Sequence, residues 1–159
     1  MESELILGLL LTILPFTELR LGLPIVLNYV IKNNLPILPY FLLVLALNIS
    51  IIFFIFFFLD FLHQHFLKIK LYKKIVNKPL IKIQKKSEKL QTKIDTLGFI
   101  ALMLFVAIPL PGTGAWTGTL IAWTLNLKRK NSIIAISIGV LIAGIIILFA
   151  SLGILNLVY

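Results

Sequence analysis

Two long runs without a charged side chain constrain this chain more than any other feature. Residues 36–59 and 132–158 contain no Asp, Glu, Lys or Arg. The first run has 24 residues, and it would form about 36 Å of α-helix, which is enough to cross a bilayer. Of all 159 residues, 60% are hydrophobic and 13% are charged, whereas a soluble domain is about one quarter charged. The sequence therefore predicts an all-α integral membrane protein with two full spans.

Prolines interrupt two further apolar blocks, at residues 5–31 and 97–127. Each block consists of two arms of about 10–13 residues, or roughly 15–20 Å of helix, which is half a membrane. Proline lacks a backbone donor and disfavours helical angles at the preceding residue, so an arm must stop near it. Each block is therefore predicted to be a re-entrant helical hairpin. The residues assigned to the breaks are Pro15, Gly22, Pro24, Pro109 and Pro111.

The two halves of the chain repeat this pattern. A shift of 94 residues places Pro15 on Pro109 and the run 36–59 on 130–153. Each half then crosses the membrane an odd number of times, so the halves have opposite orientations, as in the inverted repeats of transporters. We expect one membrane domain, 1–159, made of a first repeat, 1–60, a basic amphipathic linker, 61–96, and a second repeat, 97–159.

The positive charges predict the orientation. Ten lysines lie in residues 68–93 against a single acid, Glu88, and a second basic cluster occupies residues 128–130. Lysine and arginine favour the cytoplasmic side, and re-entrant hairpins place both clusters there, with both termini outside. The linker is predicted to be an amphipathic helix that either lies on the inner leaflet or forms a dimer seam. No aromatic or arginine-rich element accompanies the lysines, so we expect no nucleic-acid partner.

Glu18 and Arg20 are the charges that lie inside a hydrophobic block. An ionisable group at membrane depth costs at least ~2.5 kcal/mol on insertion scales, and it marks a functional site by default. Glu18 could carry or gate a proton or ion, while Arg20 could hold an anion. Alternatively, the two residues form a structural ion pair that fixes the break.

The second break has a composition suited to binding an anion. Its freed amides would lie at the start of the second arm, where unpaired N–H groups and the helix dipole attract negative charge. The same glycines and prolines also suit a tight turn, and a tryptophan there could be an interfacial anchor. The predicted substrate-binding residues are Arg20, Gly112, Thr113, Gly114, Trp116 and Thr117.

Other polar and small residues are assigned to packing. Asn48 lies in the middle of the first span and should form a helix–helix hydrogen bond. Ala135, Gly139 and Ala143 have the spacing of a packing seam. We expect no metal and no cofactor, since the chain has no cysteine and His63 and His65 are split across a helix by their spacing.

The strings TELRLGLP at 17–24 and IPLPGTGAWTG at 108–118, each followed by a span, resemble the small multidrug export protein family over nearly the whole chain. That family is distantly similar to the DedA/VTT membrane proteins. The second resemblance implies two opposed re-entrant loops and the movement of lipids or polyprenyl phosphates. By resemblance, Glu18 and Arg20 match the acidic and basic positions of the first loop. The matches in the second loop are Pro109, Pro111, Gly112, Thr113 and Gly114.

Together these features predict a transporter or scramblase of an anionic amphiphile, most simply a lipid or polyprenyl phosphate, coupled to protons or sodium ions. The alternative is an exporter of small cationic or amphipathic drugs, with Glu18 as the cation ligand. An enzyme is not expected, because the breaks contain no His, Asp, Ser or Lys. We expect a multi-pass protein of the plasma membrane that contacts membrane lipids and acts as a homodimer.

Overall fold

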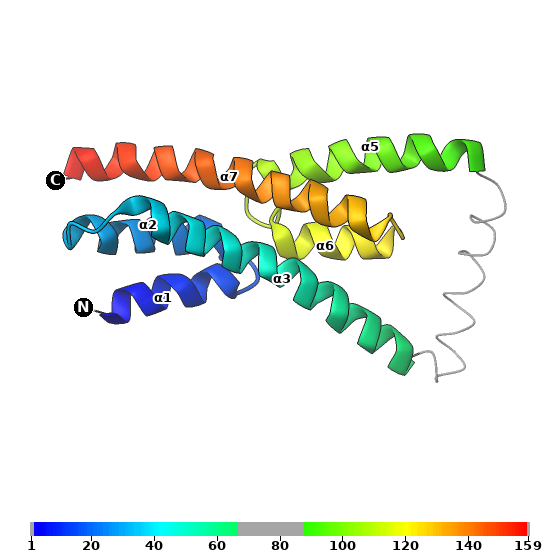
Figure 1. Ribbon diagram of the computed structural model, residues 1–159, viewed down its shortest axis with the longest axis horizontal. Coiled ribbons are helices and arrows are strands. Elements are labelled where there is room, and N and C mark those ends of the chain that lie inside the picture. Colours follow the sequence, from blue (N-terminus) through cyan, green and yellow to red (C-terminus); the bar gives the residue numbers. More distant parts are fainter. Residues whose placement is uncertain (1, 67–87, 159) are drawn as a thin grey trace.

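The computed structural model describes residues 2–66 and 88–158, and this part of the chain is built from helices and turns (Figure 1). The predicted all-α fold is confirmed for these residues. The helices are α1 (Glu2–Ile13), α2 (Glu18–Lys32), α3 (Ile37–Phe66), α5 (Glu88–Ala107), α6 (Ala115–Thr124) and α7 (Arg129–Val158).

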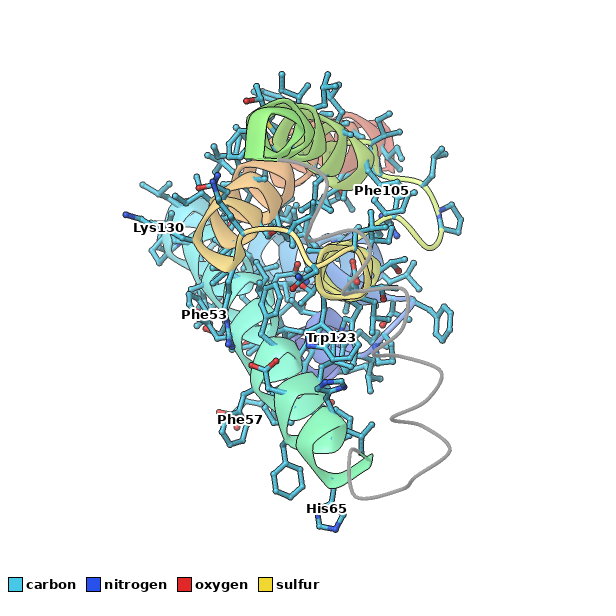
Figure 2. The ribbon with its side chains drawn as sticks, turned by 90° about the vertical axis from the view of Figure 1, so that its right-hand side faces the viewer. Phe53, Phe57, His65, Phe105, Trp123 and Lys130 are labelled. Atoms are coloured by element: carbon cyan, nitrogen blue, oxygen red, sulfur yellow. The ribbon has the colours of Figure 1, made fainter. Side chains whose placement is uncertain are left out.

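The two long helices, α3 and α7, run along the length of the molecule (Figure 1). The segments Ile37–His63 and Arg129–Leu155 are each long and apolar enough to cross a membrane. The two predicted spans are confirmed as long apolar helices, and both helices extend beyond the uncharged runs. On α3, Phe53 and Phe57 point away from the other helices (Figure 2) and are 54% and 69% exposed. Large apolar side chains in this position are suited to contact with lipid.

Two shorter helical hairpins, α1–α2 and α5–α6, enter the molecule from opposite ends, and their turns lie near the middle (Figure 1). Helix α1 ends two residues before Pro15, and α5 ends two residues before Pro109, as expected for helices that stop at proline. Both termini lie at the same end of the molecule (Figure 1). That the hairpins are re-entrant in a bilayer, and that the halves are inverted repeats, stay predictions.

Two predicted breaks are wrong, because Gly22 and Pro24 lie inside α2. A Cβ atom on Gly22 would lie 2.0 Å from Oγ1 of Thr12 and 2.8 Å from the carbonyl oxygen of Gly8. The glycine therefore allows α1 and α2 to pack closely and does not interrupt the helix. Pro24 has no backbone N–H that could donate a hydrogen bond to the carbonyl oxygen of Arg20, four residues earlier. Helix α2 nevertheless continues through Pro24.

The linker boundaries also differ from the prediction. Helix α3 continues past residue 60 to Phe66, and α5 already begins at Glu88. Residues 88–96 therefore continue directly into the first arm of the second hairpin. The rest of the predicted amphipathic linker, including most of its lysines, lies outside the described residues.

The predicted packing contacts are confirmed. A Cβ on Gly139 would lie 2.7 Å from the carbonyl oxygen of Met103 and from Cβ of Val106, so this glycine brings α7 against α5. Asn48 is 1% exposed, and its Nδ2 donates a 3.1 Å hydrogen bond to the carbonyl oxygen of Thr12. This bond joins α3 to α1 and satisfies a polar group within an apolar helix.

Candidate functional site

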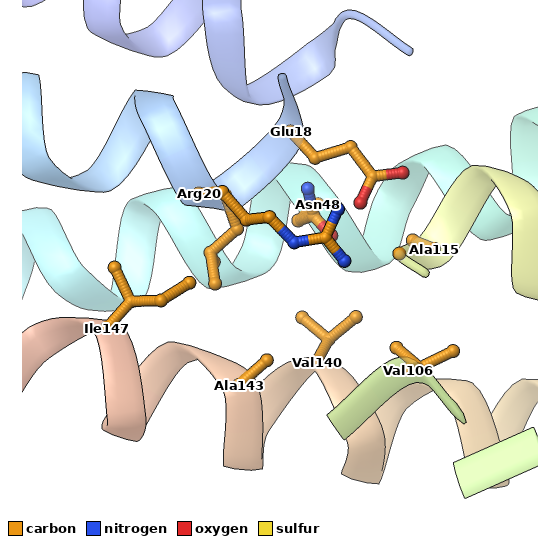
Figure 3. A pocket seen from close by; sticks show the side chains of 10 residues that line it. Glu18, Arg20, Asn48, Val106, Ala115, Val140, Ala143 and Ile147 are labelled. Atoms are coloured by element: carbon orange, nitrogen blue, oxygen red, sulfur yellow. The ribbon is translucent and has the colours of Figure 1, made fainter. Parts of the chain in front are cut away.

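The turn of the first hairpin is held in an uncommon backbone conformation. Phe16 and Glu18 have φ values of 76° and 44°, in the left-handed region that costs residues with a Cβ about 1–2 kcal/mol. Oγ1 of Thr17 donates a 2.6 Å hydrogen bond to the carbonyl oxygen of Leu11, which closes the turn on α1. Helix α2 thus starts at Glu18, whose side chain points toward the start of α6 at Ala115 (Figure 3).

Thr113 organises the turn of the second hairpin. Its Oγ1 lies 2.6 Å from the carbonyl oxygen of Ile108 and 2.8 Å from that of Leu110, and it accepts a 3.2 Å bond from the N–H of Leu110. Gly112 has a φ of 83°, which a residue with a side chain rarely adopts. The turn is followed by Gly114, which is the N-cap residue of α6.

The carboxylate of Glu18 lies at the N-terminus of α6. Glu18 is 4% exposed, and its Oε1 accepts a 3.0 Å hydrogen bond from the N–H of Trp116. A Cβ at Gly114 would lie 1.3 Å from Oε2 of Glu18, so only glycine leaves room for the carboxylate. The end of α6, which was expected to attract a substrate anion, therefore binds a carboxyl group of the protein itself.

Arg20 reaches the second hairpin as well. Its Nη2 donates a 2.7 Å hydrogen bond to Oγ1 of Thr113. Within the described residues, its Nη1 is buried and has no hydrogen-bond partner. Glu18, Arg20 and Asn48 surround a cavity of about 10 Å³ (Figure 3), close to the space that one water molecule needs. Each of the two side chains thus forms a hydrogen bond across the hairpins, and the two also interact electrostatically, as the ion pair considered from sequence would.

Of the other predicted site residues, one contacts Glu18 and two do not. Trp116 belongs to the site, because its backbone binds Glu18 and its Nε1 donates a 3.0 Å hydrogen bond to the carbonyl oxygen of Ile13. Trp116 therefore joins the two hairpins, a role that differs from the interfacial anchor considered from sequence. A Cβ on Gly112 would have no atom within 4 Å, and this glycine serves the turn. Thr117 lies half-buried on α6 and forms none of the contacts that hold the site together.

A larger pocket lies beside Arg20. Its volume is about 360 Å³, within the range of about 300–1,000 Å³ that small-molecule sites occupy. Arg20 and Pro24 of α2, Pro109 of the second turn, Ser151, and apolar residues of α7 between 146 and 155 form its lining. No sequence pattern indicated that residues 146–155 of α7 line a pocket, since α7 is apolar over most of its length.

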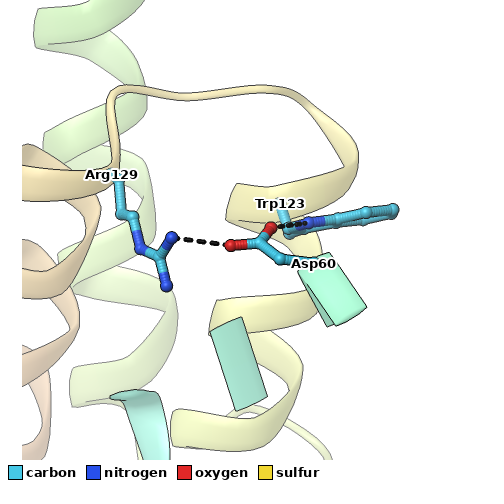
Figure 4. A network of polar contacts seen from close by, with 3 residues as sticks. All are labelled: Asp60, Trp123 and Arg129. Atoms are coloured by element: carbon cyan, nitrogen blue, oxygen red, sulfur yellow. Dashed lines mark hydrogen bonds and ion pairs between the residues drawn. The ribbon is translucent and has the colours of Figure 1, made fainter. Parts of the chain in front are cut away.

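A polar network missed from sequence joins α3, α6 and α7 (Figure 4). Nη1 of Arg129 lies 2.6 Å from Oδ2 of Asp60, and Nε1 of Trp123 donates a 3.0 Å hydrogen bond to Oδ1 of the same residue. Asp60 is 63 residues from Trp123 and 69 from Arg129, so no local pattern relates them. The network ties α3 to both sides of the α6–α7 turn.

The family described as "Putative small multi-drug export protein" matches residues 18–146. The matched part begins at Glu18 and includes the second turn and most of both long helices. No curated protein and no solved structure matches the chain. The predicted family resemblance is confirmed, while the distant similarity to DedA/VTT proteins stays a prediction.

Proposed function

Because the chain belongs to the family of putative small multi-drug export proteins, we propose that this membrane protein exports small amphipathic compounds through the region where its two hairpin turns meet. The family description supports export of such compounds more than movement of lipid or polyprenyl phosphates, which the DedA-like resemblance implied. The protein acts as a transporter and not as an enzyme.

In this proposal α3 and α7 cross the plasma membrane and the two hairpins are re-entrant from opposite faces. The lengths of the helices and the distribution of positive charge support this topology. The apolar helix Thr96–Ala107 and the arms α1, α2 and α6 are shorter than a full span. The lysines of residues 68–93 favour the cytoplasmic side, so both termini lie outside. The halves then act as inverted repeats around a central site, as transporter halves do.

One observation carries the proposal: charged side chains of the first hairpin bind the second hairpin where both turns meet. Glu18 binds the N–H of Trp116, and Arg20 binds Thr113. Both bonds join segments more than 90 residues apart, so any relative movement of the hairpins must break or exchange them. Buried charge is costly in lipid, and its presence there is typical of a transport pathway.

Glu18 is the proposed coupling residue. Protonation would remove the charge that holds its carboxylate at the N-terminus of α6 and would weaken the link between the hairpins. Arg20 stays charged throughout and is the proposed ligand of the substrate's polar group. Proton uptake at Glu18 would thereby release the two halves from each other while the substrate is held.

Export of a small amphipathic compound from cells or proteoliposomes, measured at several pH values, tests the assignment of Glu18 as the coupling residue. Glu18→Gln keeps the shape of the side chain and loses its titration, so the variant should remain folded while export becomes independent of pH. Glu4→Gln is the matched control: Glu4 lies in the first turn of α1 and is exposed, so this variant should keep the pH profile of the unmodified protein. A folded Glu18→Gln variant with an unchanged pH profile would remove Glu18 from the coupling mechanism.

A further inference from the structure

The structure points to the 360 Å³ pocket between α2, the second turn and α7 as a binding site for a small amphipathic anion. We infer that Arg20 binds the anionic head and that the apolar wall of α7 receives the body of the compound. This inference rests on the proposed function, because it names the substrate class of the same site. It also adds residues of α7 that no sequence motif indicated.

The sign of the charge follows from which groups line the pocket. Arg20 supplies the charge in its lining, and Glu18 does not contribute to it. The Glu18 carboxylate faces the separate 10 Å³ cavity and is bound by the N–H of Trp116. A compound in the larger pocket therefore lies beside the positive side chain of Arg20, while the carboxyl group of Glu18, which also interacts electrostatically with Arg20, is hydrogen-bonded to α6.

The hydrogen-bonding capacity of Arg20 agrees with an anionic head. A guanidinium carries five N–H donors and no acceptor, and Thr113 takes the Nη2 bond. Nη1 is buried without a partner in the described part of the chain and is therefore shielded from the larger pocket, which leaves Nε–H and the second Nη2–H for an acceptor there. A carboxylate, sulfonate or phosphate offers several acceptor oxygens in a geometry that guanidinium matches.

The rest of the lining fits an apolar body of limited size. Pro24, Pro109 and the residues of α7 present hydrocarbon, and Ser151 adds a hydroxyl. A volume of about 360 Å³ is near the lower end of the small-molecule range. It suits a compound with one or two aromatic rings, and it holds only part of a lipid with two acyl chains.

Binding can be measured by calorimetry on the full-length protein in detergent, with empty micelles subtracted. The probes are naphthalene-2-sulfonate and trimethyl(naphthyl)ammonium, which share an apolar body and differ in the sign of the head. The sulfonate should bind the unmodified protein tenfold or more tightly than the ammonium compound, the order of effect that a charge-assisted hydrogen bond produces. Arg20→Gln should remove this preference. Equal affinity of the unmodified protein for both probes would overturn the inference.

If Arg20→Gln does not fold, a pair of matched variants still tests whether the sulfonate binds in this pocket. Ala150 lines the pocket and is exposed, so Ala150→Trp should fill the space without disturbing the core. Ala101 is also exposed and lies on α5, away from the pocket lining. Sulfonate affinity should fall roughly tenfold or more in Ala150→Trp, as for loss of one charge-assisted contact, and stay unchanged in Ala101→Trp. Unchanged affinity in a folded Ala150→Trp variant would overturn the site.

Further arms separate the source of the anion, and they separate failure of the pocket assignment from failure of the proposed function. Displacement of the sulfonate by dihexanoyl phosphatidic acid would support the site with a lipid head as its ligand, and failure to displace would support it with a free compound. Sulfonate binding without any export would refute the proposed function and leave the pocket assignment intact. Export that Ala150→Trp does not affect would refute the pocket assignment alone.

Discussion

Replacement of Gly114 by alanine isolates the contact between Glu18 and α6. The added Cβ would lie 1.3 Å from Oε2, 2.2 Å from Cδ and 2.6 Å from Oε1 of Glu18. All three atoms are inside van der Waals contact, so the carboxylate must leave its place. It then loses the 3.0 Å bond from the N–H of Trp116, while the backbone of residue 114, at φ −96° and ψ −161°, accepts alanine without strain.

The expected loss of stability follows from these contacts. A hydrogen bond to a charged group contributes about 1.5–3 kcal/mol, and the helix N-terminus adds up to about 2 kcal/mol in a buried setting. The lower entropy of the unfolded alanine chain offsets about 0.4–1 kcal/mol. The net loss should lie between about 0.5 and 4.6 kcal/mol, and its midpoint of about 2.5 kcal/mol lowers the melting temperature by roughly 5–10 °C for a chain of this length.

Thermal unfolding of the purified protein in detergent measures the effect. Gly153→Ala is the matched control, because a Cβ there has no atom within 4 Å and alanine favours helix by up to about 1 kcal/mol. In a Glu18→Ala background the clash is gone, so Gly114→Ala should cost little in addition. An equal loss in both backgrounds, or no loss in the unmodified protein, would refute the reasoning.

Two further predictions concern topology and packing. In this cysteine-free chain, Asn34→Cys should react with a membrane-impermeant thiol reagent from outside and Asn126→Cys only from the cytoplasm, because the hairpins enter from opposite faces; labelling of both from one side would contradict the inverted arrangement. Asn48→Leu should lower stability by roughly 0.6–1.7 kcal/mol in thermal melts, since the carbonyl of Thr12 loses its partner. An unchanged melting temperature would show that this bond contributes nothing to the fold.

The positions of the helices could be predicted because they depend on local properties of the chain. An uncharged run of 24 residues is stable as a helix in lipid wherever it occurs, and Pro15 and Pro109 stop α1 and α5 through their own rings. Glu18 and Arg20 likewise mark the site through the apolar character of their sequence neighbours alone. These features need no knowledge of distant parts of the chain.

Tertiary structure decided what each of these groups contacts. Gly22 suggests a break in the sequence, but the approach of Thr12 makes it a packing glycine within α2. Glu18 was compatible with an ion pair, yet its carboxylate binds the N–H of Trp116. That choice depends on how two segments 98 residues apart pack, since the orphan amides of a helix end bind whichever acceptor the fold brings within reach.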